Sequence, residues 1–374
     1  MARNMKNEPL PVAEHGTCFD TAGFTILELL VAMAVFAMLA VLVAQLTIST
    51  TSVTAGGTKR MDVDNQARLI FDRMANDFAR MVNRPDVDCI FAKQPGNDAM
   101  FFYSEGPAYA AESLGSSTKN TVALVGYRIN TNSTKYQPPN YAAGYPVLER
   151  LGETLAWDGT TSNDASAAQD NTMPGGMVFF TYPTGSATPD PASTLDGNWT
   201  KTIGTAASQY TDGTDKDYHV LSDAVYRMEL AFLLTDGTVS TRPVTNPTTS
   251  TNNLAAAAAP TATSDRSAGY SVGSRWFDTT TGRGYICTDA TAGAAVWNPI
   301  GVQDVSAVNV AIALLDNTSR KIVSTYDSMA SALPDASGAT PIAKTWGDGN
   351  VVTGIPQAAA SQLRIYQRTF SLNK

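Results

Sequence analysis

Few residues in this 374-residue sequence are spaced to do chemistry, and the clearest group lies at positions 23 to 28. Glu28 is the one acidic residue in an apolar run that starts at Phe24, directly after Gly23, and continues to Ile48. A cut between Gly23 and Phe24 would create a terminal ammonium group close to the Glu28 carboxylate, on the same helical face. In a bundle of similar helices, the carboxylate of one subunit can meet the terminal ammonium of the next. The spacing therefore favours charge neutralisation that sets the axial stagger between subunits.

The apolar run itself can be interpreted in three ways. Roughly 20 helical residues cross the hydrocarbon core of a bilayer, so a segment over residues 24–48 spans the membrane if it inserts. A secretory signal peptide would have a shorter apolar region with its small-residue cleavage site after it, whereas Gly23 comes before this run. A plain membrane anchor explains the length but not Glu28, because an unpaired carboxylate at that depth is costly.

The string Gly23-Phe24-Thr25-Ile26-Leu27-Glu28 resembles the processing site of type IV prepilins and type II secretion pseudopilins. The shared pattern is Gly, Phe, Thr, two apolar residues and Glu, followed by a long apolar run. The resemblance implies that residues 1–23 are a leader removed by a prepilin peptidase after Gly23. It also implies that Phe24 becomes an N-methylated first residue and that Glu28 guides assembly with other pilin or pseudopilin subunits.

The same resemblance implies a single-pass protein of the inner membrane with its globular head in the periplasm, which can also enter an extracytoplasmic filament. Charge adds little to this topology. The leader carries only Arg3 and Lys6 as basic residues, and Lys59 and Arg60 lie beyond the apolar run.

A long helix is predicted over residues 24–82, because no Gly or Pro interrupts the chain before Gly56-Gly57. After this pair, apolar residues recur at steps of three and four, which is one stripe of an amphipathic helix ending near Pro85. We expect the stripe to pack on the chain's own domain rather than to form a face between subunits. The stripe consists of Ala67, Ile70, Phe71, Met74, Phe78 and Met81.

Two pairs on the same helix are spaced for exposed i,i+4 ion pairs. They are Arg68 with Asp72 and Arg73 with Asp77.

The remainder of the chain is typical of short strands and loops, which predicts an α+β fold: a long N-terminal transmembrane helix, continuing into an amphipathic helix packed on an antiparallel, β-rich, pilin-like head. The segments "DAVYRMELAFLLTDGT" and "VSAVNVAIALLDN" alternate most clearly, and we expect them to be neighbours in one sheet, with a turn at Asp236-Gly237. The residues expected on one face are Tyr226, Met228, Leu230, Phe232 and Leu234 in the first segment, and Val308, Val310, Ile312 and Leu314 in the second.

Composition divides the head into residues 83–257, an insert at 258–299 and C-terminal strands at 300–374. Residues 239–263 are rich in Thr, Asn, Ala and Pro and are typical of a flexible linker. The insert, from Gly-Ser-Arg-Trp to a closing Ala-x-Trp, resembles small β-hairpin modules of phage tail and fibre proteins. Two interpretations stay open for its aromatic residues: an adhesive surface, or the small core of a self-contained module. The order and spacing of helix and head resemble the J-type minor pseudopilins and, more narrowly, Verru/Chthon cassette protein C.

No catalytic or metal site is predicted. His15 lies in the leader, and His219 is far from any nucleophile motif. Asp212, Asp215 and Asp217 alternate as in a calcium loop, but the twelve-residue loop with its terminal Glu is missing. We therefore expect no cofactor and no enzymatic activity.

The remaining composition excludes some partners. The net charge is -8 and no basic run occurs, which argues against nucleic acid. Cys18 would leave with the leader, so Cys89 and Cys287 are the two cysteines that could pair in an oxidising compartment. The favoured function is a minor pseudopilin-like subunit of a type II secretion or type IV pilus-like filament. The alternative is a membrane-anchored surface protein that binds through the insert at 258–299.

Overall fold

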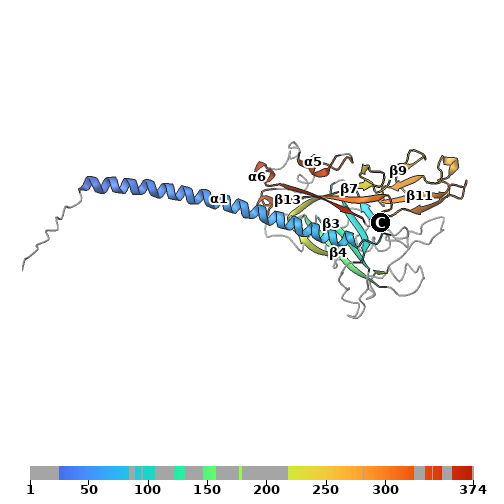
Figure 1. Cartoon of the computed structure of the whole chain (residues 1–374), viewed down its shortest axis with the longest axis horizontal. Coiled ribbons are helices and arrows are strands. Elements are labelled where there is room, and N and C mark those ends of the chain that lie inside the picture. Colours follow the sequence, from blue (N-terminus) through green and yellow to red (C-terminus); the bar gives the residue numbers. More distant parts are fainter. Residues whose placement is uncertain are drawn as a thin grey trace, which may run out of the picture. The chain divides into compact units, whose positions relative to one another are not determined.

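The chain is described here by a computed structural model, which covers residues 25–83, 89–93, 96–105, 122–130, 146–156, 177–178, 218–280, 282–323, 333–338, 340–347 and 356–372. The architecture is α+β: one long N-terminal helix is followed by mostly antiparallel sheets, as predicted (Figure 1). The chain divides into two compact units, Met1–Thr58 and Lys59–Lys374.

Helix α1 (Ile26–Ala79) passes through Gly56 and Gly57 without a break. A Cβ atom at either glycine would have nothing within 4 Å, so close packing does not require these glycines. Their low helix propensity is overcome by the long helical segments on both sides. The boundary between the two compact units follows directly after this pair.

The described strands form three sheets. The first has the order β1-β2-β3-β4-β5, with β6 also paired to β4; its strands are β1 (Cys89–Ala92), β2 (Ala99–Ser104), β3 (Ala123–Asn130), β4 (Val147–Ala156), β5 (Met177–Val178) and β6 (Tyr218–Ser222). The second has the order β14-β13-β7-β8, with β14 (Arg364–Ser371), β13 (Val305–Leu314), β7 (Val225–Leu234) and β8 (Val239–Ser240). The third has the order β12-β11-β10-β9, with β12 (Val296–Pro299), β11 (Arg283–Asp289), β10 (Arg275–Asp278) and β9 (Asn253–Ala256).

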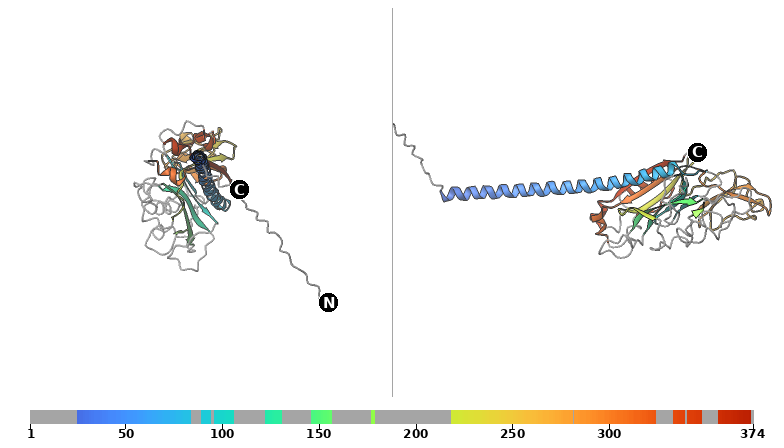
Figure 2. Two further views of the ribbon diagram at one scale, coloured as in Figure 1. Left: turned by 90° about the vertical axis from the view of Figure 1, so that its left-hand side faces the viewer. Right: turned by 90° about the horizontal axis from the view of Figure 1, so that it is seen from below.

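The main core lies where the second half of α1 packs on one face of the first two sheets (Figures 1 and 2). Every residue of the predicted helical stripe belongs to this core, with Met81 partly buried. Phe78 is held between two rings, with its centroid 4.9 Å from that of Phe102 in β2 and 5.0 Å from that of Phe370 in β14. The prediction that the stripe packs on the chain's own domain is therefore confirmed.

The predicted pairing of the two alternating segments is also confirmed, because β7 and β13 are antiparallel neighbours. Gly237, with φ of 83°, forms the turn between β7 and β8. One facing residue was predicted wrongly. Tyr226 lies in the second core, on the opposite face from Met228, because a register irregularity between β7 and β13 occurs beside it.

The second core covers the other face of the β7–β13 sheet. It is closed by two short helices, α5 (Ile342–Gly347) and α6 (Gln357–Ala360). Trp346 of α5 is the largest side chain of this cluster, and its indole N–H donates to the Pro334 carbonyl at 2.9 Å.

The third sheet contains the predicted insert, since residues 258–299 supply β10, β11 and β12. Its fourth strand, β9, comes from the preceding segment and pairs in parallel with β10. Tyr270, Trp276 and Trp297 pack against one another with centroids 5.5, 5.6 and 5.7 Å apart. Both indole N–H groups donate within the module, to the Ala258 and Ser264 carbonyls. This packing favours the interpretation that the aromatics form the module's own core.

Specific contacts join this module to the second sheet. Arg275 of β10 donates from Nε and Nη2 to Asp304, at 2.8 and 3.1 Å. Asp304 also accepts from the backbone N–H of Thr245, within the segment expected to be a flexible linker. That segment is instead structured here, because it forms β8 and β9 and supplies this hydrogen bond.

Candidate functional site

The candidate site begins at the first turn of α1, where Thr25 and Glu28 bond each other reciprocally. The Thr25 backbone N–H and hydroxyl both donate to Oε2 of Glu28, at 3.0 and 2.9 Å. The Glu28 backbone N–H donates back to the Thr25 hydroxyl at 3.2 Å. This arrangement is a capping box, which satisfies donors that a helix N-terminus otherwise leaves open. Both bonds from Thr25 end on Oε2.

The role of Thr25 was not predicted, although the Thr-x-x-Glu spacing in the sequence was a sufficient signal. Gly23 and Phe24, the predicted processing residues, lie outside the described residues. The assembly role of Glu28 therefore stays a prediction. Its place at N3 of the helix adds that Glu28 has a local structural role as well.

The helix that follows has the length and composition of a membrane span. Within the described part of the chain, α1 is the one helix that meets both criteria. Its apolar side chains are exposed, for example Ile26 at 82 % and Phe36 at 74 %. A continuous exposed apolar surface of this kind is rare in water and is typical of contact with lipid or with other helices.

The last residues of the span and the helical residues after it are rich in threonine. Five threonine hydroxyls there donate to the carbonyl four residues earlier, so each of these hydroxyls is satisfied within the helix. The residues with this bond are Thr47, Thr50, Thr51, Thr54 and Thr58.

A buried polar cluster fixes the second half of α1 to the first sheet. Arg150 of β4 donates to both carboxylate oxygens of Asp77, at 2.7 and 2.9 Å, and the Tyr127 hydroxyl also donates to Asp77. Asp77 is only 1 % exposed. Burial and the charge of Asp77 hold the pKa of Tyr127 well above its ordinary value. The prediction of an exposed ion pair between Arg73 and Asp77 is therefore wrong in one respect, the exposure of Asp77. Arg73 does lie 3.9 Å from the Asp77 carboxylate, but that carboxylate is buried and already paired with Arg150.

Two exposed contacts join α1 to β14. Arg368 donates to Asp72 at 2.7 Å, and the Tyr366 hydroxyl donates to Asp64. Asp72 therefore pairs across to a strand, where the sequence predicted a partner on its own helix. Burial and the bond to Asp64 raise the pKa of Tyr366.

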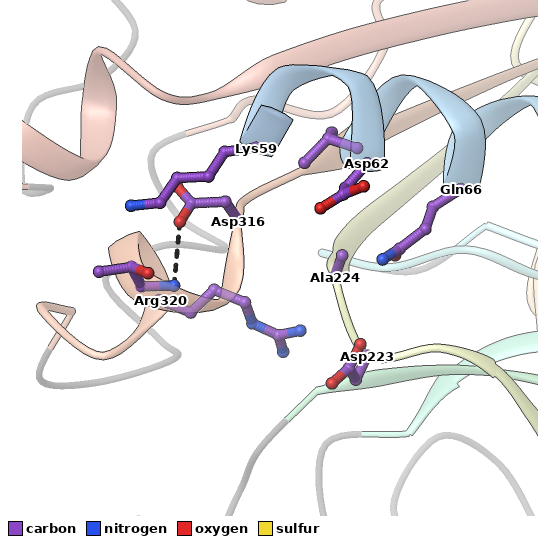
Figure 3. A pocket seen from close by; sticks show the side chains of 9 residues that line it. Lys59, Asp62, Gln66, Asp223, Ala224, Asp316 and Arg320 are labelled. Atoms are coloured by element: carbon purple, nitrogen blue, oxygen red, sulfur yellow. Dashed lines mark hydrogen bonds between the residues drawn. The ribbon is translucent and has the colours of Figure 1, made fainter. Parts of the chain in front are cut away.

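A pocket of about 180 Å³ lies in the head beside the start of its α1 segment (Figure 3). Two of the polar residues that line it make structural hydrogen bonds. Asp316 caps α3 (Asn317–Arg320) by accepting from the Thr318 N–H at 2.9 Å, and Arg320 donates to the Pro146 carbonyl at 2.6 Å. Charges of both signs line the pocket. The lining residues are Lys59, Asp62, Val63, Gln66, Asp223, Ala224, Asp316, Thr318 and Arg320.

The structure offers no metal cluster among the residues it describes. Asp212, Asp215 and Asp217 lie outside them, so the calcium-like alternation is untested. His219 lies in β6, opposite Arg150 of β4. Cys89 and Cys287 are both buried thiols, so the disulfide considered from the sequence is not formed.

Comparison with protein families finds the prokaryotic N-terminal methylation motif at residues 19–44. Neither the curated proteins nor the solved structures gave a match. The motif covers the Gly23 to Glu28 string and most of the apolar run. It supports a protein of the type IV pilin or pseudopilin kind, with an N-terminal helix suited to membrane anchoring.

Proposed function

We propose that this chain is a minor pseudopilin-like structural subunit of a type II secretion or type IV pilus-like filament. A prepilin peptidase cleaves it after Gly23, Phe24 becomes N-methylated, and residues 24–48 hold it in the inner membrane with the head in the periplasm. Other pilin or pseudopilin subunits then assemble with it through the N-terminal helix. The observation that carries the proposal is the methylation motif at residues 19–44, located where a long exposed apolar helix begins.

The two halves of α1 differ in whether their apolar side chains are covered, and this difference suits a filament subunit. The first half leaves its apolar side chains exposed, so lipid or neighbouring helices must cover them. In the second half, the apolar stripe is already covered by the chain's own head, and the Asp77–Arg150 cluster adds to this contact. Assembly contacts are therefore assigned to residues before Thr58.

We propose that this role is structural and does not include catalysis of an external substrate. The polar clusters of the head that are described above bond one another or cap helices. The J-type minor subtype is supported by the order of helix and β-rich head, with the third sheet as an addition to that plan.

The test is mass spectrometry of the protein from the membrane fraction of cells that contain an active prepilin peptidase. We expect a mature N-terminus at Phe24 that carries a methyl group. Gly23→Val should block cleavage, because a branched side chain replaces the residue recognised at the cut. Gly57→Ala is the matched control, since a Cβ there meets no atom within 4 Å, and it should be cleaved normally. A different N-terminus, or an intact leader in the wild type, would contradict the proposal.

A further inference from the structure

The connection between β1 and β2 brings one amine against two buried carboxylates. Nζ of Lys93 lies 2.6 Å from Oδ2 of Asp98 and 3.0 Å from the Leu230 carbonyl, and it also contacts Oε1 of Glu229. The side chains of Asp98 and Glu229 are fully buried, and that of Lys93 is 19 % exposed. The amine is thus in direct contact with a carboxylate oxygen of Asp98, so the two groups that would form a bond are held together.

The two carboxylates have different surroundings, which suit different chemical roles. Glu229 accepts hydrogen bonds from Arg227 Nη2 at 3.0 Å and from the Ala336 N–H at 2.9 Å. Burial, opposed by the charge of Lys93 and assisted by that of Glu229, raises the pKa of Asp98 to about 7. A neutral carboxylic acid is an electrophile for an amine, and an ionised carboxylate is a base.

We propose that Lys93 and Asp98 join in an intramolecular amide bond, with Glu229 as the base. Glu229 takes one proton from the Lys93 ammonium, and the neutral Nζ attacks Cγ of Asp98. The bond from Cγ to the hydroxyl breaks, and the hydroxyl leaves as water with the proton that Glu229 returns. Glu229 then takes the second proton from nitrogen and releases it to solvent. The net change is one new N–C bond and one water lost, so no oxidant, reductant or cofactor is needed.

The product suits this environment better than the reactants do. A neutral amide replaces the charged amine and the titratable carboxyl group in a site where burying charge is costly. The amide oxygen keeps the hydrogen bond from the Leu230 N–H, which now reaches Asp98 Oδ2 at 2.7 Å. The amide N–H can still donate to the Leu230 carbonyl or to Glu229.

The bond would also fix the position of Asn97 and Asp98, which contact the open edge of β7. The Asp98 N–H donates to the Met228 carbonyl at 3.1 Å, and the Asn97 side chain accepts from the Met228 N–H at 2.8 Å. These contacts cover the part of the β7 edge that β8 does not reach. An amide between Lys93 and Asp98 would hold Asn97 and Asp98 on this edge and protect the edge from pairing with other chains.

The experiment is intact mass spectrometry of the purified full chain, followed by peptide mapping. We expect the wild-type mass to be lower than the sequence mass by one water, with trypsin unable to cut after Lys93. The cut distinguishes this amide from cyclisation at Asp98 alone, which also loses water but leaves Lys93 cleavable. Asp98→Asn should lose ammonia instead and reach the same final mass as the crosslinked wild type.

Two variants test the roles. Lys93→Arg keeps the positive charge but cannot form the amide, so it should have its full mass. Glu229→Gln keeps the shape but removes the base, and it should lose at least ten-fold in the crosslinked fraction at early times. A wild-type chain of full mass that is cut normally after Lys93 overturns the proposal, whether or not the variants fold. Unchanged crosslinking in Glu229→Gln would overturn the assignment of the base.

Discussion

Asp77 in α1 and Arg150 in β4 form a buried two-point ion pair, with N–O distances of 2.7 and 2.9 Å. The pair joins the second half of α1 to the first sheet of the head. The Tyr127 hydroxyl is a third partner, so no charge in the cluster is left without compensation. The packing of the α1 residues after Thr58 on the sheets depends on this contact as well as on the apolar stripe.

Replacing one member of the pair should therefore lower the free energy of unfolding more than replacing both members does. Arg150→Met leaves Asp77 buried without its main partner, which we expect to lower the free energy of unfolding by about 3–5 kcal/mol. The double variant Asp77→Leu with Arg150→Met should recover part of this loss. Chemical unfolding of the full chain in detergent, followed by circular dichroism, measures both. Arg73→Ala is the control and should change stability by less than about 0.5 kcal/mol, because Arg73 is a distant surface partner. Equal losses for Arg73→Ala and Arg150→Met would contradict this account.

Phe78 should be the most sensitive position of the helical stripe. Its ring stacks on both Phe102 and Phe370, so Phe78→Ala leaves a cavity between helix and sheet and should cost about 3–5 kcal/mol. Leu69 lies on the same helix but is 70 % exposed, and Leu69→Ala is the matched apolar control. Thermal unfolding of both variants checks the difference. A loss for Leu69→Ala as large as that for Phe78→Ala would show that the opposite face of α1 is packed too.

The features predicted correctly are those that local periodicity decides. The stripe from Ala67 to Phe78 repeats with the helical period, and the facing residues of β13 alternate, so each specifies its buried side. Asp77 could not be predicted as buried, because its partner Arg150 lies far along the sequence in a strand with no charge pattern. The reversal at Tyr226 depends on a register shift against β13, which has no local signal. The contacts of Asn97 and Asp98 with the edge of β7 likewise form only when the first two sheets pack together.

The contact between Arg275 and Asp304 should make the attachment of the third sheet sensitive to acid. Burial would raise the pKa of Asp304, but the hydrogen bonds from Arg275 and Thr245 outweigh it, so the pKa is lowered in the folded state. A lowered carboxyl pKa adds stability above the ordinary Asp value of about 3.9, and the stability is lost as pH falls through the folded value. We expect Asp304→Asn to lower the melting temperature at pH 7. The difference from wild type should shrink below about pH 4. A difference that stays constant down to pH 2 would mean that ionised Asp304 does not stabilise the fold.

The first turn of α1 allows the two roles of Glu28 to be separated. A Gln side chain can still accept from the Thr25 N–H and so keep the capping box, but it has no charge to neutralise a terminal ammonium. If charge pairing with a neighbouring subunit is what Glu28 provides, Glu28→Gln should insert and be cleaved normally yet lose crosslinks to other filament subunits. Thr25→Val is the complementary change, because it removes the hydroxyl of the box and leaves the carboxylate. The lost cap typically costs about 1 kcal/mol, which a long membrane helix tolerates, so Thr25→Val should still crosslink. Crosslinking is compared at equal membrane abundance, with Glu28→Leu as the variant that lacks both functions. If Glu28→Gln assembles as well as wild type while Thr25→Val and Glu28→Leu fail, Glu28 acts by shaping the helix start rather than by its charge.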